Sequence, residues 1–164
     1  MKIQIETEVR GLDEARLTRF IGKARKAVGL NGEVGALLTS NSEMQRLNRT
    51  FRGKNKPTDV LSFPAVDAVA AKFAGDLAIS ADIASANAAD LGHSVEDEVR
   101  VLILHGLLHL AGYDHESDDG QMARKESRLR AELGLPSNLI ARTEGDPLKR
   151  KKPKPRNSSP RRAR

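Results

Sequence analysis

The chain contains no cysteine and no tryptophan among its 164 residues, and aromatic residues account for only 3% of the sequence. Without cysteine there are neither disulfide bonds nor thiolate ligands, so histidine and carboxylate groups remain as the available metal ligands. The scarcity of aromatic residues predicts a core built mainly from leucine, isoleucine, valine and alanine. The sequence has no apolar run as long as a membrane span and no secretory signal, so we expect a soluble cytoplasmic protein.

Positive charge is concentrated at one end of the chain. The formal net charge is +6 and the isoelectric point is about 9.8, but residues 147–164 contain nine lysines or arginines and no acidic residue. Residues 1–146 therefore carry a formal charge of about −3. Because a segment rich in proline and charge cannot bury a core, we predict one domain over residues 1–146 and a disordered basic tail after it. The tail suits a nucleic acid best, although an anionic membrane or a purely solubilising role fits the same composition.

Three of the four histidines lie within eleven residues, at positions His105, His109 and His115. Two histidines four residues apart on a helix project from the same face. Gly112 can then end the helix in a left-handed conformation, and the reversed chain can bring His115 back to the same point. Three neutral imidazoles without a fourth protein ligand describe a catalytic zinc site with one position left for water. The fourth histidine, His93, is expected to be a surface residue.

The helix that carries the first two of these histidines is predicted to be buried and central. Ser94 can cap it, acidic residues occupy its first turn, and apolar residues surround it nearly completely. Ser80 and either Asn41 or Ser42 are further predicted caps. The chain as a whole predicts an α+β fold, in which a small mixed β-sheet packs with helices. Apolar periodicity places the strands at residues 2–9, 33–39, 60–63 and 76–79, and the helices at residues 12–28, 41–48, 81–91, 95–111 and 118–133.

The histidine string resembles the zinc-peptidase signature His-Glu-x-x-His-x-x-Gly-x-x-His, with one departure. Gly106 stands where the peptidases have the glutamate that acts as general base on the metal-bound water. This departure disfavours peptide hydrolysis by the usual route. It leaves open a reaction in which the base comes from elsewhere or is not needed.

A second cluster of functional interest is basic. Arg46, Arg49, Arg52, Lys54 and Lys56 lie close together in a domain that is otherwise slightly acidic. Guanidinium and ammonium groups suit phosphate, and arginine can bind it with two parallel hydrogen bonds. The last four, Arg49, Arg52, Lys54 and Lys56, are therefore candidates to bind RNA phosphates, although a solvated polar loop over residues 51–59 would have the same composition.

Three segments stand out when they are read together. Residues 51–64 read FRGKNKPTDVLSFP, residues 75–80 read GDLAIS, and residues 105–115 read HGLLHLAGYDH. In this order and spacing they resemble the YbeY family of endoribonucleases, which are bacterial rRNA maturation factors. The resemblance covers about residues 1–140, and the histidine string with glycine in second position is highly specific. The basic tail falls outside it.

The resemblance implies a metal-dependent endoribonuclease that cuts single-stranded RNA. The implied roles are rRNA processing, including maturation of the 3′ end of the small-subunit rRNA, and ribosome quality control. His105, His109 and His115 are implied to hold one zinc ion, Zn(2+), per chain, and Arg52 to face the metal pocket as a catalytic residue. The implied partners are rRNA and the small ribosomal subunit, a small-subunit ribosomal protein and a ribosome-associated GTPase, and no membrane.

The residues leave parts of the mechanism open. Arg52 would neutralise charge on the phosphoryl oxygens in the transition state, while either water or the RNA 2′-hydroxyl could attack phosphorus. Asp114 and Glu116 flank His115, and we expect Asp114 to orient a histidine ring rather than to carry a proton. A non-enzymatic, zinc-containing ribosome assembly factor and a zinc peptidase remain as competing functions. Structural zinc usually has four protein ligands, and only three are evident here, which disfavours the assembly factor.

Overall fold

The computed structural model describes residues 1–66 and 72–137, and it confirms the predicted α+β fold. The strands are β1 (Lys2–Ile5), β2 (Glu33–Thr39), β3 (Val60–Pro64) and β4 (Phe73–Ser80). The helices are α1 (Glu14–Val28), α2 (Asn41–Arg52), α3 (Ala81–Leu91), α4 (Val95–Leu110) and α5 (Gln121–Glu132). None of these helices is long and apolar enough to cross a lipid bilayer. The tail predicted over residues 147–164 lies outside the described residues.

The four strands form one mixed sheet, as predicted, in the order β1-β2-β4-β3. β1 and β2 are parallel, and so are β2 and β4. β3 runs antiparallel to β4 and forms one edge of the sheet. Arg52 of the basic cluster lies beside this edge strand.

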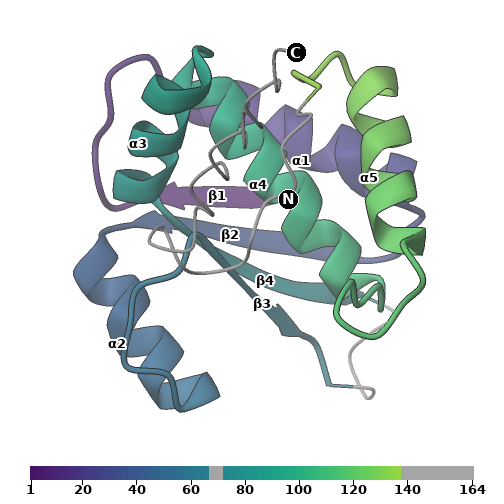
Figure 1. Cartoon of the computed structure of the whole chain (residues 1–164), viewed down its shortest axis with the longest axis horizontal. Helices are drawn as coiled ribbons and strands as arrows, with labels where there is room; N and C mark the ends of the chain where they lie inside the picture. Colours follow the sequence, from purple (N-terminus) through teal and green to yellow (C-terminus); the bar gives the residue numbers. More distant parts are fainter. Residues whose placement is uncertain (67–71, 138–164) are drawn as a thin grey trace, which may run out of the picture.

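The two faces of the sheet are covered to different extents (Figure 1). α1 and α4 pack on one face, where their aliphatic side chains form the main core with β2 and β4. α2 lies on the opposite face, where Met44, Leu61 and Ala78 form a smaller buried cluster with the partly buried Leu47 and Phe63. One face is therefore sealed by helices, whereas the other is only partly covered by α2.

α4 is the most buried of the described helices, as its sequence predicts. Nine of its sixteen residues are buried, because it packs against α1, α3, α5 and the two strands β3 and β4. Its predicted cap is confirmed, since the Ser94 Oγ accepts a hydrogen bond from the Asp97 N–H at 3.1 Å. The surrounding core thus holds α4 in place over its whole length, including the C-terminal turns that carry the histidines.

α2 differs from its predicted extent at both ends. Ser40 caps it instead of Asn41 or Ser42, and its Oγ accepts a backbone hydrogen bond from the first turn. The helix passes its predicted end at residue 48 and continues to Arg52, because no helix-breaking residue occurs before Gly53. Gly53 has a left-handed φ of 67° and ends the helix. Arg52 therefore belongs to a helix and not to the predicted polar loop.

The remaining boundaries differ from the prediction by a few residues. β1 ends at Ile5 instead of residue 9, and β4 begins at Phe73 instead of residue 76, where it already pairs with β2. α5 begins at Gln121 instead of residue 118. The Asp118 carboxylate accepts two backbone hydrogen bonds from the start of α5, so it belongs to the turn before the helix.

Gly106 marks the closest approach of α4 to the sheet. A Cβ atom added there would lie 2.8 Å from Leu77 Cδ2 and 3.2 Å from Val60 Cγ2. The Gly106 carbonyl also accepts a hydrogen bond from the buried Ser62 Oγ, at 3.0 Å. The lack of a side chain at this position therefore lets α4 sit directly on β3 and β4.

We expect Gly106→Ala to destabilise the fold, although alanine favours helix more than glycine does. Overpacking a core costs about 1–3 kcal/mol, whereas the gain in helix propensity is about 1 kcal/mol. Gly22→Ala in α1 is the matched control, because a Cβ there would meet only Met1 Cε, at 3.9 Å. Urea unfolding should show a lower free energy of unfolding for the first variant and an equal or higher one for the second. An equal increase in the free energy of unfolding for both variants would contradict the close contact of Gly106 with Leu77 and Val60.

Candidate metal centre

The structure brings the three predicted histidines together at the C-terminal end of α4. His105 and His109 lie one turn apart, and their Nε2 atoms are 3.1 Å from each other. The three side chains each offer a nitrogen atom, and these nitrogens all lie within 4.8 Å of one another. Nitrogen ligands of a tetrahedral zinc ion, each about 2.0–2.1 Å from the metal, lie roughly 3.3 Å apart. The triad could therefore hold a metal ion after small movements of its side chains.

The turn that returns His115 to this point forms as the sequence predicts. Gly112 has a left-handed φ of 93°, and its N–H donates to the His109 carbonyl at 3.0 Å. The next N–H, of Tyr113, donates to the Leu108 carbonyl at 3.1 Å. These bonds end the helix and reverse the chain, so the ring of His115 lies 5.3 Å, between centroids, from that of His109.

Hydrogen-bond partners orient two of the rings toward a shared metal position. His109 Nδ1 lies 3.0 Å from the Tyr113 carbonyl oxygen, and His105 Nδ1 lies 3.4 Å from Glu126 Oε2. Both partners accept hydrogen bonds, so a neutral ring in either position would donate its Nδ1 proton to them and turn its Nε2 atom toward the other histidine. The two Nε2 atoms lie 3.1 Å apart, close to the separation of two nitrogen ligands on one tetrahedral zinc ion. The donor set therefore fits a metal ion.

Glu126 is the residue of this site that the sequence does not reveal. It belongs to α5, and its other carboxylate oxygen accepts a hydrogen bond from Arg130 at 3.1 Å. Burial alone would raise the pKa of Glu126, but the contacts with His105 and Arg130 hold that pKa below its usual value. The sequence shows only a local Glu126–Arg130 pair on a helix, and the contact with His105 arises from the packing of α5 beside α4.

The predicted site residue Asp114 holds the loop around His115. Its Oδ1 accepts a hydrogen bond from the Glu116 N–H, and its Oδ2 accepts one from the Ser117 hydroxyl, both at 3.0 Å. The Asp114 carbonyl accepts a further bond from the Asp118 N–H at 3.1 Å. These contacts place the backbone on both sides of the third histidine, so Asp114 shapes the turn that presents the ring.

Arg52 is connected to the metal helix through one residue of β3. Its guanidinium lies 3.5 Å from the Ser62 carbonyl oxygen, and Ser62 Oγ donates to the Gly106 carbonyl, next to His105 in α4. Arg52 is exposed, at the edge of the sheet beside β3. The other candidate RNA-binding residues are also exposed at this end of α2 and in the loop after it: Arg49, Lys54 and Lys56.

His93 is not the surface residue that the sequence predicts. Its Nε2 lies 2.6 Å from Glu98 Oε2, and its side chain is only 14% exposed. Glu98 is fully buried in the first turn of α4, where a carboxylate requires polar partners. The prediction was wrong because the burial of Glu98 cannot be read from its place among other acidic residues.

The packing around Gly106 gives a steric reason against the peptidase alternative. A glutamate side chain at this position would begin with the Cβ atom that already meets Leu77 and Val60. The space beside Gly106 is therefore filled by these two side chains. A glutamate there, the general base of the zinc peptidases, would have to displace them.

The chain is similar to known proteins of one family. The sequence profile of the family described as Endoribonuclease YbeY matches residues 2–134. A protein named Endoribonuclease YbeY from Koribacter versatilis is 55% identical over 142 residues, which cover 86% of this chain and 91% of that protein. One of the same name from Nautilia profundicola is 50% identical over 112 residues, covering 68% of this chain and 80% of that protein.

A solved structure is also similar. The solution structure of TM1509 from Thermotoga maritima matches with a TM-score of 0.52 and 32% sequence identity. The match covers 80% of this chain and 88% of that one. The family profile matches most of the sequence, and the relatives are 50–55% identical over more than two thirds of it. This chain therefore belongs to the YbeY family.

Proposed function

We propose that this protein is a zinc-dependent endoribonuclease that cuts single-stranded RNA. The observation that carries the proposal is the convergence of His105, His109 and His115, with nitrogen atoms within 4.8 Å of one another. The relatives named Endoribonuclease YbeY support RNA as the substrate. We further propose roles in rRNA processing, including maturation of the small-subunit rRNA 3′ end, and in ribosome quality control.

The three histidines would hold one zinc ion per chain. Neutral imidazoles are the commonest ligands of catalytic zinc, and three protein ligands leave a position for substrate. A zinc ion bound there would supply a Lewis acid that stabilises negative charge on a phosphodiester. Glu126 and the Tyr113 carbonyl keep two of the rings in the tautomer that such an ion requires.

The chain's own residues would position the RNA. Arg52, at the end of α2, would neutralise the charge that builds up on the phosphoryl oxygens in the transition state. Arg49, Lys54 and Lys56 are exposed at the same end of α2 and would bind phosphates along the strand. Contacts with phosphates do not depend on the bases, so these residues would bind single strands of different sequence.

The partners follow from the family resemblance and are proposed on that ground. They are rRNA within the small ribosomal subunit, a small-subunit ribosomal protein and a ribosome-associated GTPase. A protein with these partners would act in the cytoplasm, where ribosomes are assembled.

Cleavage of a single-stranded rRNA-precursor fragment tests the proposed activity. The full-length protein should cut the fragment, lose activity on chelation and recover it when zinc is restored. An identically purified His109→Ala protein should be inactive, because only two imidazoles remain. Equal cleavage by both proteins would contradict the proposal and point to a contaminating nuclease. A folded, zinc-loaded wild-type protein that does not cleave isolated RNA or RNA within small subunits would favour a non-enzymatic assembly factor.

Arg52→Ala should slow cleavage by about 10²–10³-fold, the usual cost of removing one group that stabilises transition-state charge. Its zinc content should not change, since the Arg52 guanidinium contacts the Ser62 carbonyl of β3. Arg46→Ala is the matched control on the same helix, because the Arg46 guanidinium pairs with Glu43. Single-turnover cleavage rates of the two variants measure the effect. A purely structural arginine would instead lower thermal stability and leave the rate per folded molecule unchanged.

Glu126→Gln should weaken zinc binding by about 10–100-fold, the range typical of lost partners of metal-bound histidines. Glutamine keeps the shape of the side chain but removes the charge that strengthens the His105 ring as a ligand. Glu132→Gln, on the same helix, removes an exposed carboxylate that pairs with Arg128 and should bind zinc as the wild type does. Competition with a chromophoric chelator measures both affinities. Equal zinc affinities of the two variants would show that Glu126 does not contribute to metal binding.

A further inference from the structure

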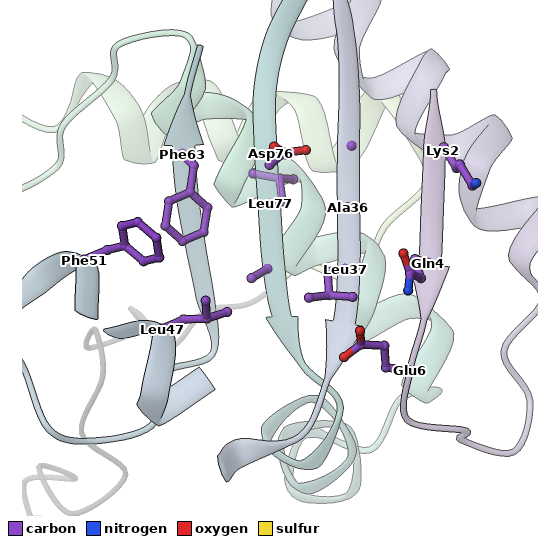
Figure 2. A pocket seen from close by; sticks show the side chains of 12 residues that line it. Lys2, Gln4, Glu6, Ala36, Leu37, Leu47, Phe51, Phe63, Asp76 and Leu77 are labelled. Carbon is purple, nitrogen blue, oxygen red and sulfur yellow. The ribbon is translucent and has the colours of Figure 1, made fainter. Parts of the chain in front are cut away.

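Most charged side chains of this protein are reached by solvent. Figure 2 shows two of them, Lys2 and Asp76, on the open face of the sheet, where both are exposed. Among the described residues, only Glu98 and Arg130 are both charged and buried, and Glu98 contacts His93. Burying a guanidinium group is unfavourable unless the group is paired. The place of Arg130 in α5 therefore requires a partner.

The partner of Arg130 is Glu126, one turn earlier in α5. Arg130 Nη2 lies 3.1 Å from Glu126 Oε1, and the two side chains are 8% and 14% exposed. The same helix contains a second arginine–glutamate pair at a spacing of four residues, Arg128 and Glu132. The side chains of that pair are 61% and 57% exposed, and its charged atoms are 3.8 Å apart. Because water screens a buried ion pair less than an exposed one, the first pair fixes the position of its two groups more firmly.

The two oxygens of the Glu126 carboxylate have different partners. Oε1 accepts a hydrogen bond from Arg130, whereas Oε2 lies 3.4 Å from His105 Nδ1. A glutamate side chain samples several rotamers unless it is held. Since both oxygens belong to one planar group, the bond from Arg130 sets the direction in which Oε2 points. Arg130 thus turns this second oxygen toward a metal-ligating histidine.

Stability alone does not account for an arginine at this position. The Arg130 Nε atom is buried and has no hydrogen-bond partner among the described residues, and such an unmade hydrogen bond destabilises a fold. Met122 and Leu129 of the same helix are buried in the main core, so the surroundings also suit an apolar side chain. Well-packed apolar residues often stabilise a protein as much as a buried ion pair does, or more. The arginine therefore indicates a role beyond packing.

We propose that Arg130 is a positioning residue of the metal centre, which acts through Glu126 to hold His105 in the orientation that binds the metal ion. The proposal deepens the proposed function and rests on it, because it requires a zinc ion at the three histidines. With Glu126 held in place, His105 Nδ1 has a fixed acceptor, and His105 Nε2 faces that of His109. Partners that orient ligand rings contribute to metal affinity. Arg130 therefore strengthens zinc binding from outside the set of ligands.

Arg130→Met should weaken zinc binding by about ten-fold, the lower end of the range for lost partners of metal-bound histidines, because Glu126 stays but is no longer held. Methionine removes the guanidinium and leaves an unbranched side chain that can fill the site. Arg128→Met is the matched control on the same helix, because its pair with Glu132 is exposed. Its zinc affinity should equal that of the wild type. Competition with a chromophoric chelator measures the affinities, and circular dichroism verifies that each variant is folded.

A double-mutant cycle with Glu126→Gln separates positioning from a structural effect. Arg130→Met should change zinc affinity by less than about two-fold in the Glu126→Gln protein, because no carboxylate is left to be held. Equal ten-fold losses in both backgrounds would overturn the proposal. Arg130→Lys should keep most of the affinity, since the contact with Glu126 is a single hydrogen bond that an ammonium group can also donate. The cycle is run with Arg130→Leu if Arg130→Met does not fold.

RNA cleavage by the same proteins keeps this proposal and the proposed function apart. A wild type that binds zinc and cleaves RNA, with an Arg130→Met protein that binds zinc equally well, would overturn the role of Arg130 and leave the nuclease standing. A wild type that shows the expected coupling but does not cleave RNA would support the role of Arg130 and reject the nuclease. A folded wild type that does not bind zinc would overturn both.

Discussion

The contact between α4 and the sheet at Gly106 is the constraint on which the rest of the structure depends. The absence of a side chain lets the helix backbone reach Leu77 and Val60, and the Ser62 hydroxyl bonds to the Gly106 carbonyl within the same contact. His105 precedes this position, so the contact also sets where the first metal ligand stands. A glutamate at position 106 would have to displace the Leu77 and Val60 side chains. One close approach therefore positions the histidines and removes the peptidase base together.

The histidines acquire their direction from groups outside their own motif. The Tyr113 carbonyl, in the turn after α4, lies within hydrogen-bond distance of His109 Nδ1, and the Glu126 carboxylate on α5 lies beside His105 Nδ1. The Nε2 atoms of the two histidines therefore face each other. The Asp114 turn returns His115 to them. Rings held in this way need little rearrangement to bind a metal ion, since the cost of ordering them has been met on folding. The packing of α5 against α4 is thus part of the site.

The edge strand β3 packs against helices on both faces of the sheet through the alternation of its side chains. Val60 and Ser62 face α4, whereas Leu61 and Phe63 face α2. Because successive residues of a strand point to opposite faces, neighbouring positions of β3 pack against the metal helix on one face of the sheet and against α2 on the other. Arg52 contacts this strand at its outer edge.

The sequence by itself determined the α+β class, the buried α4 with its Ser94 cap, and the meeting of the three histidines. All of these rest on local periodicity and turn chemistry, in which a spacing of four residues and a left-handed glycine suffice. It could not reveal the contact of Glu126 with His105, the burial of Glu98 against His93, or the strand register that pairs Asp76 of β4 with Gly35 of β2. These contacts join residues of different elements, and only tertiary packing and strand register decide which elements become neighbours. The length of α2, which carries Arg52 to the edge of the sheet, was likewise visible only in the structure, because helix propensity sets ends poorly.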